Sequence, residues 1–385
     1  MSTPFTRLGF YLGIMMGSPF EKISPIKANH KTIQDVFGVN SYPTSRTMRQ
    51  IFSHKDWLFC TNSFRYDSPD KPGLFVEDRE FSLRSYTDII TNSNKTNSEI
   101  ALSISMPLQN TLCSYPQINS SGSKNITPVR NYINHLLHEI RLVSEFIPDN
   151  RSINYIHWQG EIAQLLTPAE MTEIMYSLNK AFTLQNEREG TYVIELEKVP
   201  ADDSVIALIK GLGFNHICLG TQNRDHGPID FDFLAEQVKI FKQYGFKTVN
   251  VRFLTGKHES CDKLSKKLEG LIAINPDTIY LIDEEERQSV LSGVETDEST
   301  DCTCHNAFEK RLIDANYQKL NHVKFSKDSS VSKGISGDLI GIGLGATSLI
   351  ENAFAHNVDQ LDQYYQKLKN NQLPFAYGGY IRPKY

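Results

Sequence analysis

The sequence has few cysteines, no long apolar run and no large excess of one charge, and each of these features argues against a class of protein. Six cysteines are scattered through 385 residues, at positions 60, 113, 218, 261, 302 and 304, which is not the spacing of a disulfide framework. No apolar run approaches the length of a membrane span. The net charge of -5 and the pI of about 6.1 give no electrostatic basis for binding nucleic acid. The apolar stretch 8–17 is not followed by a small-residue cleavage site. We therefore expect a cytoplasmic protein.

From about residue 100 the sequence alternates between short apolar runs and amphipathic segments. The apolar runs predict strands at 101–106, 152–158, 191–197, 214–220, 247–254 and 277–282. Apolar residues at a helical period predict helices at 128–146, 167–182, 202–213, 231–245 and 260–274. Thr167 and Glu170 have the spacing of a capping box at the start of the second helix. Such alternation is typical of βαβ units and a parallel sheet. The predicted fold class is α/β, a partial (βα)6 barrel.

The chain divides into three predicted parts. Residues 1–100 lack the alternation and are predicted to be an irregular N-terminal extension. Residues 101–330 form the predicted barrel, and 331–385 a short C-terminal segment that packs on it. The acidic stretch 283–301 is predicted to be a solvated loop.

Polar residues follow several predicted strands, and ligands of such folds gather at the carboxyl ends of the strands. The second strand ends in IHWQGEIA, the third in IELEKVP, the fourth in LGTQNRD and the fifth in NVRFLTG. A later segment reads SGDLIGIGLGATS, and NSYPTS lies near the N-terminus. Polar groups at strand ends more often face a site than the core, by about two to one for Glu195 and Gln222.

Taken in order, these segments resemble the oxygen-independent coproporphyrinogen III oxidase family of radical S-adenosylmethionine (SAM) proteins. The resemblance covers roughly residues 38–380 and implies a (βα)6 partial barrel, a [4Fe–4S] cluster and SAM. Tyr42 matches a substrate-side motif, and His157 with Trp158 matches the start of a His-Trp-Gly-Gly-Gly-Thr-Pro motif. By the same resemblance the candidate ligand-binding residues are Tyr42, His157, Trp158, Gly160, Glu161, Glu195, Gln222, Arg252 and Asp338.

The sequence departs from the family at the positions that carry its chemistry. The loop MPLQNTLCSYP aligns with the three-cysteine cluster motif, but Gln109 and Pro116 replace the outer cysteines and only Cys113 remains. Glu161 stands in the glycine run, and Arg252 replaces an aspartate of the family. The resemblance also implies a C-terminal helical domain, which we expect to be missing after IRPKY.

A site-differentiated [4Fe–4S] cluster needs three thiolates, and glutamine and proline supply none. We therefore expect no metal site, with the cluster and SAM not bound. The predicted function is a binding or regulatory pseudo-enzyme of the family, whose partner is a tetrapyrrole or related ligand, or an active paralogue. Two alternatives stay open. One is an enzyme with new chemistry at the barrel mouth. The other is a SAM-dependent oxidoreductase of porphyrin biosynthesis with unusual cluster ligands.

Other motifs have simpler interpretations. Cys302, Cys304 and His305 form a C-x-C-H run, a weak zinc signal because structural zinc sites usually show two spaced pairs. The G-x-G-x-G run at 341–345 indicates close backbone packing more than a phosphate loop. Trp158 fits a packing role as well as a ligand role, and Cys218 fits a small core residue.

Overall fold

The protein is described by a computed structural model. The described residues are 73–96, 99–106, 127–160, 166–186, 188–196, 203–220, 229–255, 260–283, 302–320, 324–328 and 337–383. All described residues belong to one compact unit, Ser45–Tyr385.

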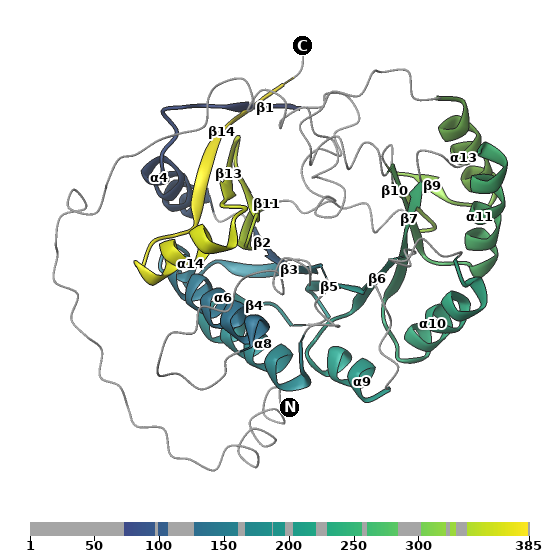
Figure 1. Cartoon of the computed structure of the whole chain (residues 1–385), viewed down its shortest axis with the longest axis horizontal. Coiled ribbons are helices and arrows are strands. Elements are labelled where there is room, and N and C mark those ends of the chain that lie inside the picture. Colours follow the sequence, from purple (N-terminus) through teal and green to yellow (C-terminus); the bar gives the residue numbers. More distant parts are fainter. Residues whose placement is uncertain are drawn as a thin grey trace. The chain divides into compact units, whose positions relative to one another are not determined.

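The elements alternate along most of this unit (Figure 1). The strands are β1 (Gly73–Glu77), β2 (Glu99–Ser105), β3 (Ser152–Gln159), β4 (Thr183–Leu184), β5 (Thr191–Leu196), β6 (His216–Gly220), β7 (Thr248–Thr255), β8 (Thr278–Asp283), β9 (Gln318–Lys319), β10 (Lys324–Ser326), β11 (Gly337–Gly343), β12 (Thr347–Ile350), β13 (Ala353–Asn357) and β14 (Phe375–Pro383). The helices are α4 (Leu83–Ser93), η2 (Asn94–Thr96), α6 (Pro128–Ser144), α8 (Pro168–Ala181), α9 (Asp203–Gly211), α10 (Phe231–Gln243), α11 (Cys261–Ile274), α13 (Cys302–Asp314) and α14 (Leu361–Lys369).

One mixed sheet connects the strands in the order β1-β14-β13-β12-β11-β2-β3-β5-β6-β7-β8-β10-β9, with β4 beside β3. The strands from β11 through β2, β3, β5, β6 and β7 to β8 are parallel to their neighbours. Antiparallel strands extend the sheet on both sides of this centre. Parallel neighbours put all their carboxyl ends at one edge, so loops from distant parts of the sequence meet there.

The two faces of the sheet differ in what covers them. Helices α6, α8, α9, α10 and α11 lie along one face (Figure 1), and the main apolar core fills the space between them and the strands. A second cluster contains only strand residues: Ala101, Tyr155, Val193, Cys218, Leu339, Leu349 and Phe354, with Tyr280 and Tyr377 partly buried against them. We call the face that carries this second cluster the inner face.

The sequence predicted the central elements well. Each of the six predicted strands and five predicted helices is present, with ends shifted by at most two residues. The predicted capping box is confirmed: the Thr167 hydroxyl accepts from the Glu170 amide, and the Glu170 carboxylate accepts from the Thr167 amide. The predicted α/β class is confirmed, whereas barrel closure and the boundaries at 100 and 330 stay predictions. Within the predicted extension, residues 73–96 form β1, α4 and η2.

Two further points concern helices and cysteines. Among the described residues, no helix combines the length and the apolar character needed to cross a membrane. Cys218 is buried among apolar strand residues, as predicted, but Cys261 is disulfide-bonded, which the cysteine spacing did not indicate.

Candidate functional site

Three predicted residues meet at the carboxyl ends of the central strands. Glu195 on β5 lies between His157 on β3 and Arg252 on β7, and all three side chains are on the inner face. The Arg252 Nη1 atom lies 3.0 Å from Glu195 Oε2, and His157 Nε2 lies 3.1 Å from Glu195 Oε1. The Gly160 amide approaches Glu195 Oε2 at 3.4 Å. We call these four residues the Glu195 site.

Burial sets the electrostatics of this site. The side chains of Glu195 and His157 are 3% and 6% exposed, and that of Arg252 is 11% exposed. Burial by itself raises the pKa of Glu195, but the Arg252 guanidinium, His157 and the Gly160 amide together outweigh it and hold the pKa below its ordinary value. Glu195 is therefore ionised at neutral pH, and Arg252 compensates its charge.

His157 contacts Glu195 through one of its two ring nitrogens. Its Nε2 atom lies 3.1 Å from Glu195 Oε1, whereas Nδ1 is buried and has no hydrogen-bond partner among the described residues. A buried polar atom without a partner is uncommon and calls for an explanation, such as a ligand or water that supplies the missing bond. The His157 Nδ1 atom is therefore a candidate contact for a bound molecule or water.

Gly160 has a clear structural reason to be glycine. Its φ is +90°, and an added Cβ would lie 2.3 Å from the carbonyl oxygen of Met106, at the end of the neighbouring strand β2. The Met106 amide in turn donates to the Gln159 carbonyl. The glycine thus allows β2 and β3 to stay paired where their loops begin. Next to it, the side-chain amide of Gln159 donates from Nε2 to the Ser103 hydroxyl.

Two predicted residues are not part of this group. Trp158 points to the helix face, where it is fully buried and packs edge-on against Phe214. Asp338 lies at the amino end of β11, where its carboxylate accepts from Arg151 Nη2 at 3.0 Å and from the Glu351 amide at 3.0 Å. The Arg151 and Asp338 side chains are each 1% exposed, so this buried ion pair has a structural role within the fold. Neither residue is therefore part of the Glu195 site, and their expected ligand contacts stay predictions.

The remaining predicted positions lie outside the described residues or their described side chains. These positions are Tyr42, Gln109, Cys113, Pro116, Glu161 and Gln222, together with Cys302, Cys304 and His305. Their roles stay predictions.

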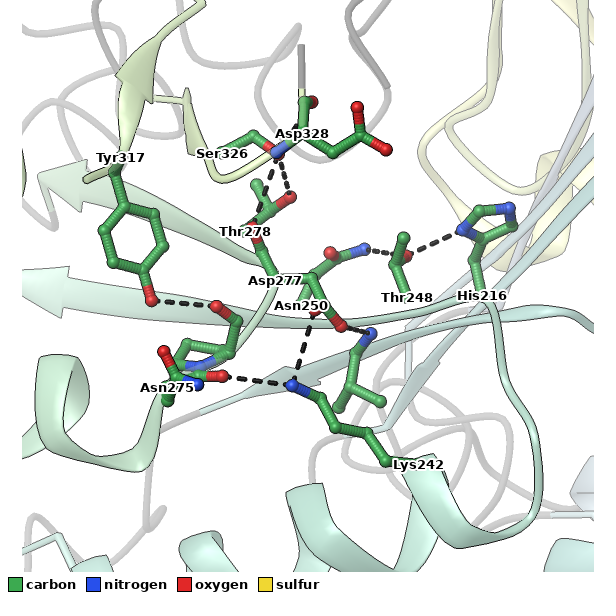
Figure 2. A network of polar contacts seen from close by, with 12 residues as sticks. His216, Lys242, Thr248, Asn250, Asn275, Asp277, Thr278, Tyr317, Ser326 and Asp328 are labelled. Carbon is green, nitrogen blue, oxygen red and sulfur yellow. Dashed lines mark hydrogen bonds and ion pairs between the residues drawn. The ribbon is translucent and has the colours of Figure 1, made fainter. Parts of the chain in front are cut away.

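A second polar network lies toward the amino ends of β6, β7 and β8 (Figure 2). The Thr248 hydroxyl lies 2.7 Å from His216 Nδ1 and accepts from Asn250 Nδ2 at 3.1 Å. The Asp277 carboxylate accepts from the Val249 amide and pairs with Lys242 at 3.4 Å. Burial, with nearby lysines, lowers the pKa of His216 to about 4. A depression of about 430 Å³ lies on the helix side near Lys242, away from the Glu195 site. These contacts link β6, β7 and the start of β8 to one another and to α10.

The sequence did not indicate a third polar group, around Glu139 of α6. This carboxylate is 1% exposed and accepts three hydrogen bonds: from the Gly343 amide at 2.9 Å, the Tyr364 hydroxyl at 2.6 Å and Asn357 Nδ2 at 2.8 Å. A signal was present, because Glu139 falls in the apolar stripe of the helix, three residues after Leu136 and four before Val143. A charged residue in such a stripe must be buried with partners.

Comparison with known proteins finds similar sequences that are all named as coproporphyrinogen III oxidases. The chain is 22% identical over 324 residues to the oxygen-independent coproporphyrinogen III oxidase of Pseudomonas aeruginosa, covering 75% of this chain and 70% of that protein. It is 20% identical over 355 residues to the Escherichia coli enzyme of the same name, covering 81% and 75%. No protein-family model matches the chain.

The fold comparison agrees with the sequence comparison. The structure is similar to that of coproporphyrinogen III oxidase from Escherichia coli, described as a radical SAM enzyme, with a TM-score of 0.65 and 17% identity. The match covers 78% of this chain and 76% of that one. The resemblance that the motifs predicted is confirmed: the chain is similar to the oxygen-independent coproporphyrinogen III oxidases in sequence and to the Escherichia coli structure in fold.

Proposed function

We propose that this chain is a ligand-binding relative of the oxygen-independent coproporphyrinogen III oxidases that works without a cluster. Its ligand is a carboxylated tetrapyrrole or a similar amphipathic molecule, held on the inner face of the sheet. The observation that carries the proposal is the Glu195 site, in which an arginine of the chain itself already compensates the charge of the buried carboxylate.

The residues aligned with the cluster motif do not fit a [4Fe–4S] cluster. Three thiolates hold such a cluster when SAM occupies the fourth iron, and Gln109, Cys113 and Pro116 supply one. Proline has neither a side-chain ligand nor a backbone N–H to offer a cluster sulfur.

The Glu195 site also fits SAM poorly. By the resemblance, Glu195 corresponds to the third-strand glutamate of the family. SAM brings a sulfonium and an ammonium group, and a nearby guanidinium disfavours both. Here Arg252 lies 3.0 Å from the carboxylate, so an incoming cation would have to compete with a buried arginine. The ion pair therefore favours a ligand that does not need Glu195 as a counter-charge.

The inner face supports an amphipathic ligand. Its apolar cluster includes the buried aromatic rings of Tyr155 and Phe354, and the aromatic rings of Tyr280 and Tyr377 are only partly buried against it. The Glu195 site lies on the same face, and the Nδ1 atom of its His157 can bond to a polar group of a ligand. Aromatic surface next to a few placed polar groups is typical of sites for large cofactor-like molecules. A tetrapyrrole combines a broad apolar ring system with carboxylates.

Binding of coproporphyrin III tests the ligand class, since this fluorescent porphyrin has the same carboxylates as the porphyrinogen. Titration should give a Kd of about 1 μM, equivalent to about -8 kcal/mol. Tyr377→Ala should weaken binding at least tenfold. Tyr380→Ala is a matched control, because Tyr380 is on the same strand but lies opposite Ala353, on the helix face, and is 43% exposed. Equal affinity in both variants would refute binding on the inner face.

Iron and SAM test the loss of the family cofactors separately. After anaerobic treatment with iron and sulfide, the wild-type chain should retain far less than four irons per chain. It should also give no heat with SAM in calorimetry. A stable four-iron cluster that disappears in Cys113→Ala would show that the cluster survives, as would SAM binding at micromolar concentration.

A further inference from the structure

Glu139 joins three parts of the fold that are far apart in the sequence. It belongs to α6, and its three donors come from the end of β11, from α14 and from the end of β13. In Figure 1, α14 lies beside α6 next to these strands. Asn357 Nδ2 also donates to the Gly343 carbonyl at 2.9 Å. Both the amide and the carbonyl of Gly343 are thus tied into the same buried group.

A second side chain of α6 fixes the neighbouring strand. The Tyr132 hydroxyl donates to the Ser105 carbonyl at 2.8 Å, at the end of β2, and accepts from the Leu344 amide at 3.0 Å. Gly343 has a φ of +112°, and an added Cβ would lie 2.3 Å from the Ser105 carbonyl oxygen. The turn after β11 and the end of β2 therefore pack backbone against backbone, held in place by α6.

The described residues around Glu139 supply hydrogen-bond donors but no cation. The titratable groups near it are tyrosines: Tyr86 from α4, Tyr132 from α6 and Tyr364 from α14. Burial raises the pKa of all three hydroxyls, so they stay protonated at any ordinary pH. Among the described residues, no lysine, arginine or histidine pairs with Glu139, and β11 contributes only backbone groups. Isolated burial of a carboxylate is costly, because hydrogen bonds replace only part of its hydration.

We propose that Glu139 is a proton-operated joint: the gain or loss of one proton at this carboxyl changes how firmly α6 holds α14 and the turn after β11. Both protonation states fit the contacts, but differently. The ionised carboxylate accepts from all three donors. The protonated form keeps the Gly343 and Asn357 bonds, and its O–H points to the Tyr364 oxygen, whose hydroxyl can accept as well as donate.

Burial raises the pKa of Glu139 to about 7, against the lowering effect of its three hydrogen bonds. The folded state therefore binds the proton more tightly than the unfolded chain does. The sign follows from linkage: the stabilisation is complete below the ordinary pKa of glutamate and is lost as the pH rises toward 7. As the pH rises toward 7, α6 therefore holds α14 and the turn after β11 less firmly, next to the ends of β2 and β11. This inference does not depend on which ligand the inner face binds.

Urea unfolding of the full chain at pH values from 5 to 8.5 tests the joint. Relative to Glu139→Gln, the wild-type unfolding equilibrium constant should rise by up to tenfold per pH unit between pH 5 and 7. The glutamine keeps the shape, and its amide oxygen can accept from Gly343 and Tyr364. Glu145→Gln is the control, since Glu145 caps the same helix at an exposed position, and it should keep the wild-type profile. The same profile in wild type and Glu139→Gln would overturn the proposal.

A second measurement is independent of any variant. In wild-type protein with carbon-13 in the glutamate side chains, one carboxyl resonance should titrate near pH 7. Hydrogen exchange in peptides from 337 to 369, corrected for the intrinsic effect of pH, should speed up over the same range. Tyr364→Phe removes one donor and should move the carboxyl midpoint upward. A wild-type protein in which all glutamates titrate below pH 5.5 would overturn the proposal.

Discussion

At the residue scale, the Glu195 site shows how buried charge depends on its partner. Glu195 and Arg252 are 57 positions apart in the sequence, and each is nearly enclosed. A buried pair of this kind adds little over a well-packed apolar pair, but removing one member leaves an uncompensated charge. The importance of Arg252 therefore lies in what its loss would do to Glu195.

Arg252→Met should lower the free energy of unfolding by about 3–5 kcal/mol at pH 7. The pKa of Glu195 is now held below its ordinary value, so its contribution is present at neutral pH and lost as the pH falls through the folded-state value. Without the guanidinium, burial would raise that pKa. The deficit should then shrink toward pH 4, as protonation removes the buried charge. Urea unfolding at both pH values measures the change.

The matched control is Arg311→Met, because Arg311 pairs with Glu269 at 2.7 Å with both side chains well exposed. Its cost should stay below about 1 kcal/mol. The double variant Arg252→Met with Glu195→Gln should recover much of the lost stability. An Arg252→Met protein as stable as the control variant would show that the pair does not neutralise Glu195 as described.

At the element scale, the sequence predicted what depends on local pattern and missed what depends on distant contacts. The strands and helices of the βα units were found because apolar periodicity and capping residues are local. The strands β12, β13 and β14 were not predicted, since they form an antiparallel meander with no βα alternation. The run at 341–345 was expected to mark close backbone packing, and Gly341 and Gly343 show that packing.

The site was predicted in part for the same reason. The rule that parallel strands share a carboxyl edge brought His157, Glu195 and Arg252 to one place. The sequence separation of these residues does not show that Glu195 pairs with Arg252, because that pairing depends on the register of β5, β6 and β7. Asp338 lies apart from these three residues, because it is near the amino end of β11, and the motif did not indicate this position.

Gly160→Ala tests the contact between the ends of β2 and β3. The substitution should lower the free energy of unfolding by about 2 kcal/mol or more, since the φ of +90° strains an alanine and the new Cβ would overlap the Met106 carbonyl. Gly211→Ala is the control: its added Cβ has no atom within 4 Å, and it should stabilise α9 by about 0.5 kcal/mol. Thermal and urea unfolding of both variants would decide, and equal stability would contradict the described contact.

At the scale of the whole unit, the C-terminal strands complete the sheet. β11 pairs with β2 along its full length, from Gly337 beside Glu99 to Gly343 beside Ser105. β2 is buried over most of its length, so it is built as an interior strand. A strand of that kind left at an edge presents unpaired backbone groups to other chains. The segment after 337 therefore belongs to the folded sheet.

A chain that ends before residue 337 should consequently be recovered as aggregates. Removing β11 exposes the edge of β2 together with the apolar residues that faced Ile340 and Ile342. Adding residues 337–385 as a separate polypeptide during expression should raise the soluble yield. Size-exclusion chromatography of the soluble fraction measures both effects. A soluble, monomeric truncated chain would show that β2 does not need β11.

The pH dependence of the stability of the whole unit should combine two opposing groups. Burial lowers the pKa of His216 to about 4, so the folded state binds this proton more weakly, and stability falls as the pH drops from about 6.5. His135, whose pKa burial also lowers, acts in the same direction. Glu139, with its raised pKa, favours the folded state at low pH and loses that contribution as the pH rises toward 7. The His216 and Glu139 contributions reach at most about 3 kcal/mol each and oppose one another between about pH 4.5 and 6.5.

The wild-type chain should therefore show a shallow stability profile over that interval, as a result of compensation. His216→Asn removes the contribution of His216, so its pH profile should show that of Glu139, and the variant should become more stable relative to wild type as the pH falls. Glu139→Gln removes the opposite contribution, so its profile should show that of the histidines, and it should become less stable relative to wild type over the same range. The double variant should return to a shallow profile, because the two groups lie in separate networks and their effects should add. Urea unfolding at half-unit pH steps measures all four curves. If His216→Asn and Glu139→Gln shift the profile in the same direction, the opposing signs assigned to the two groups are wrong.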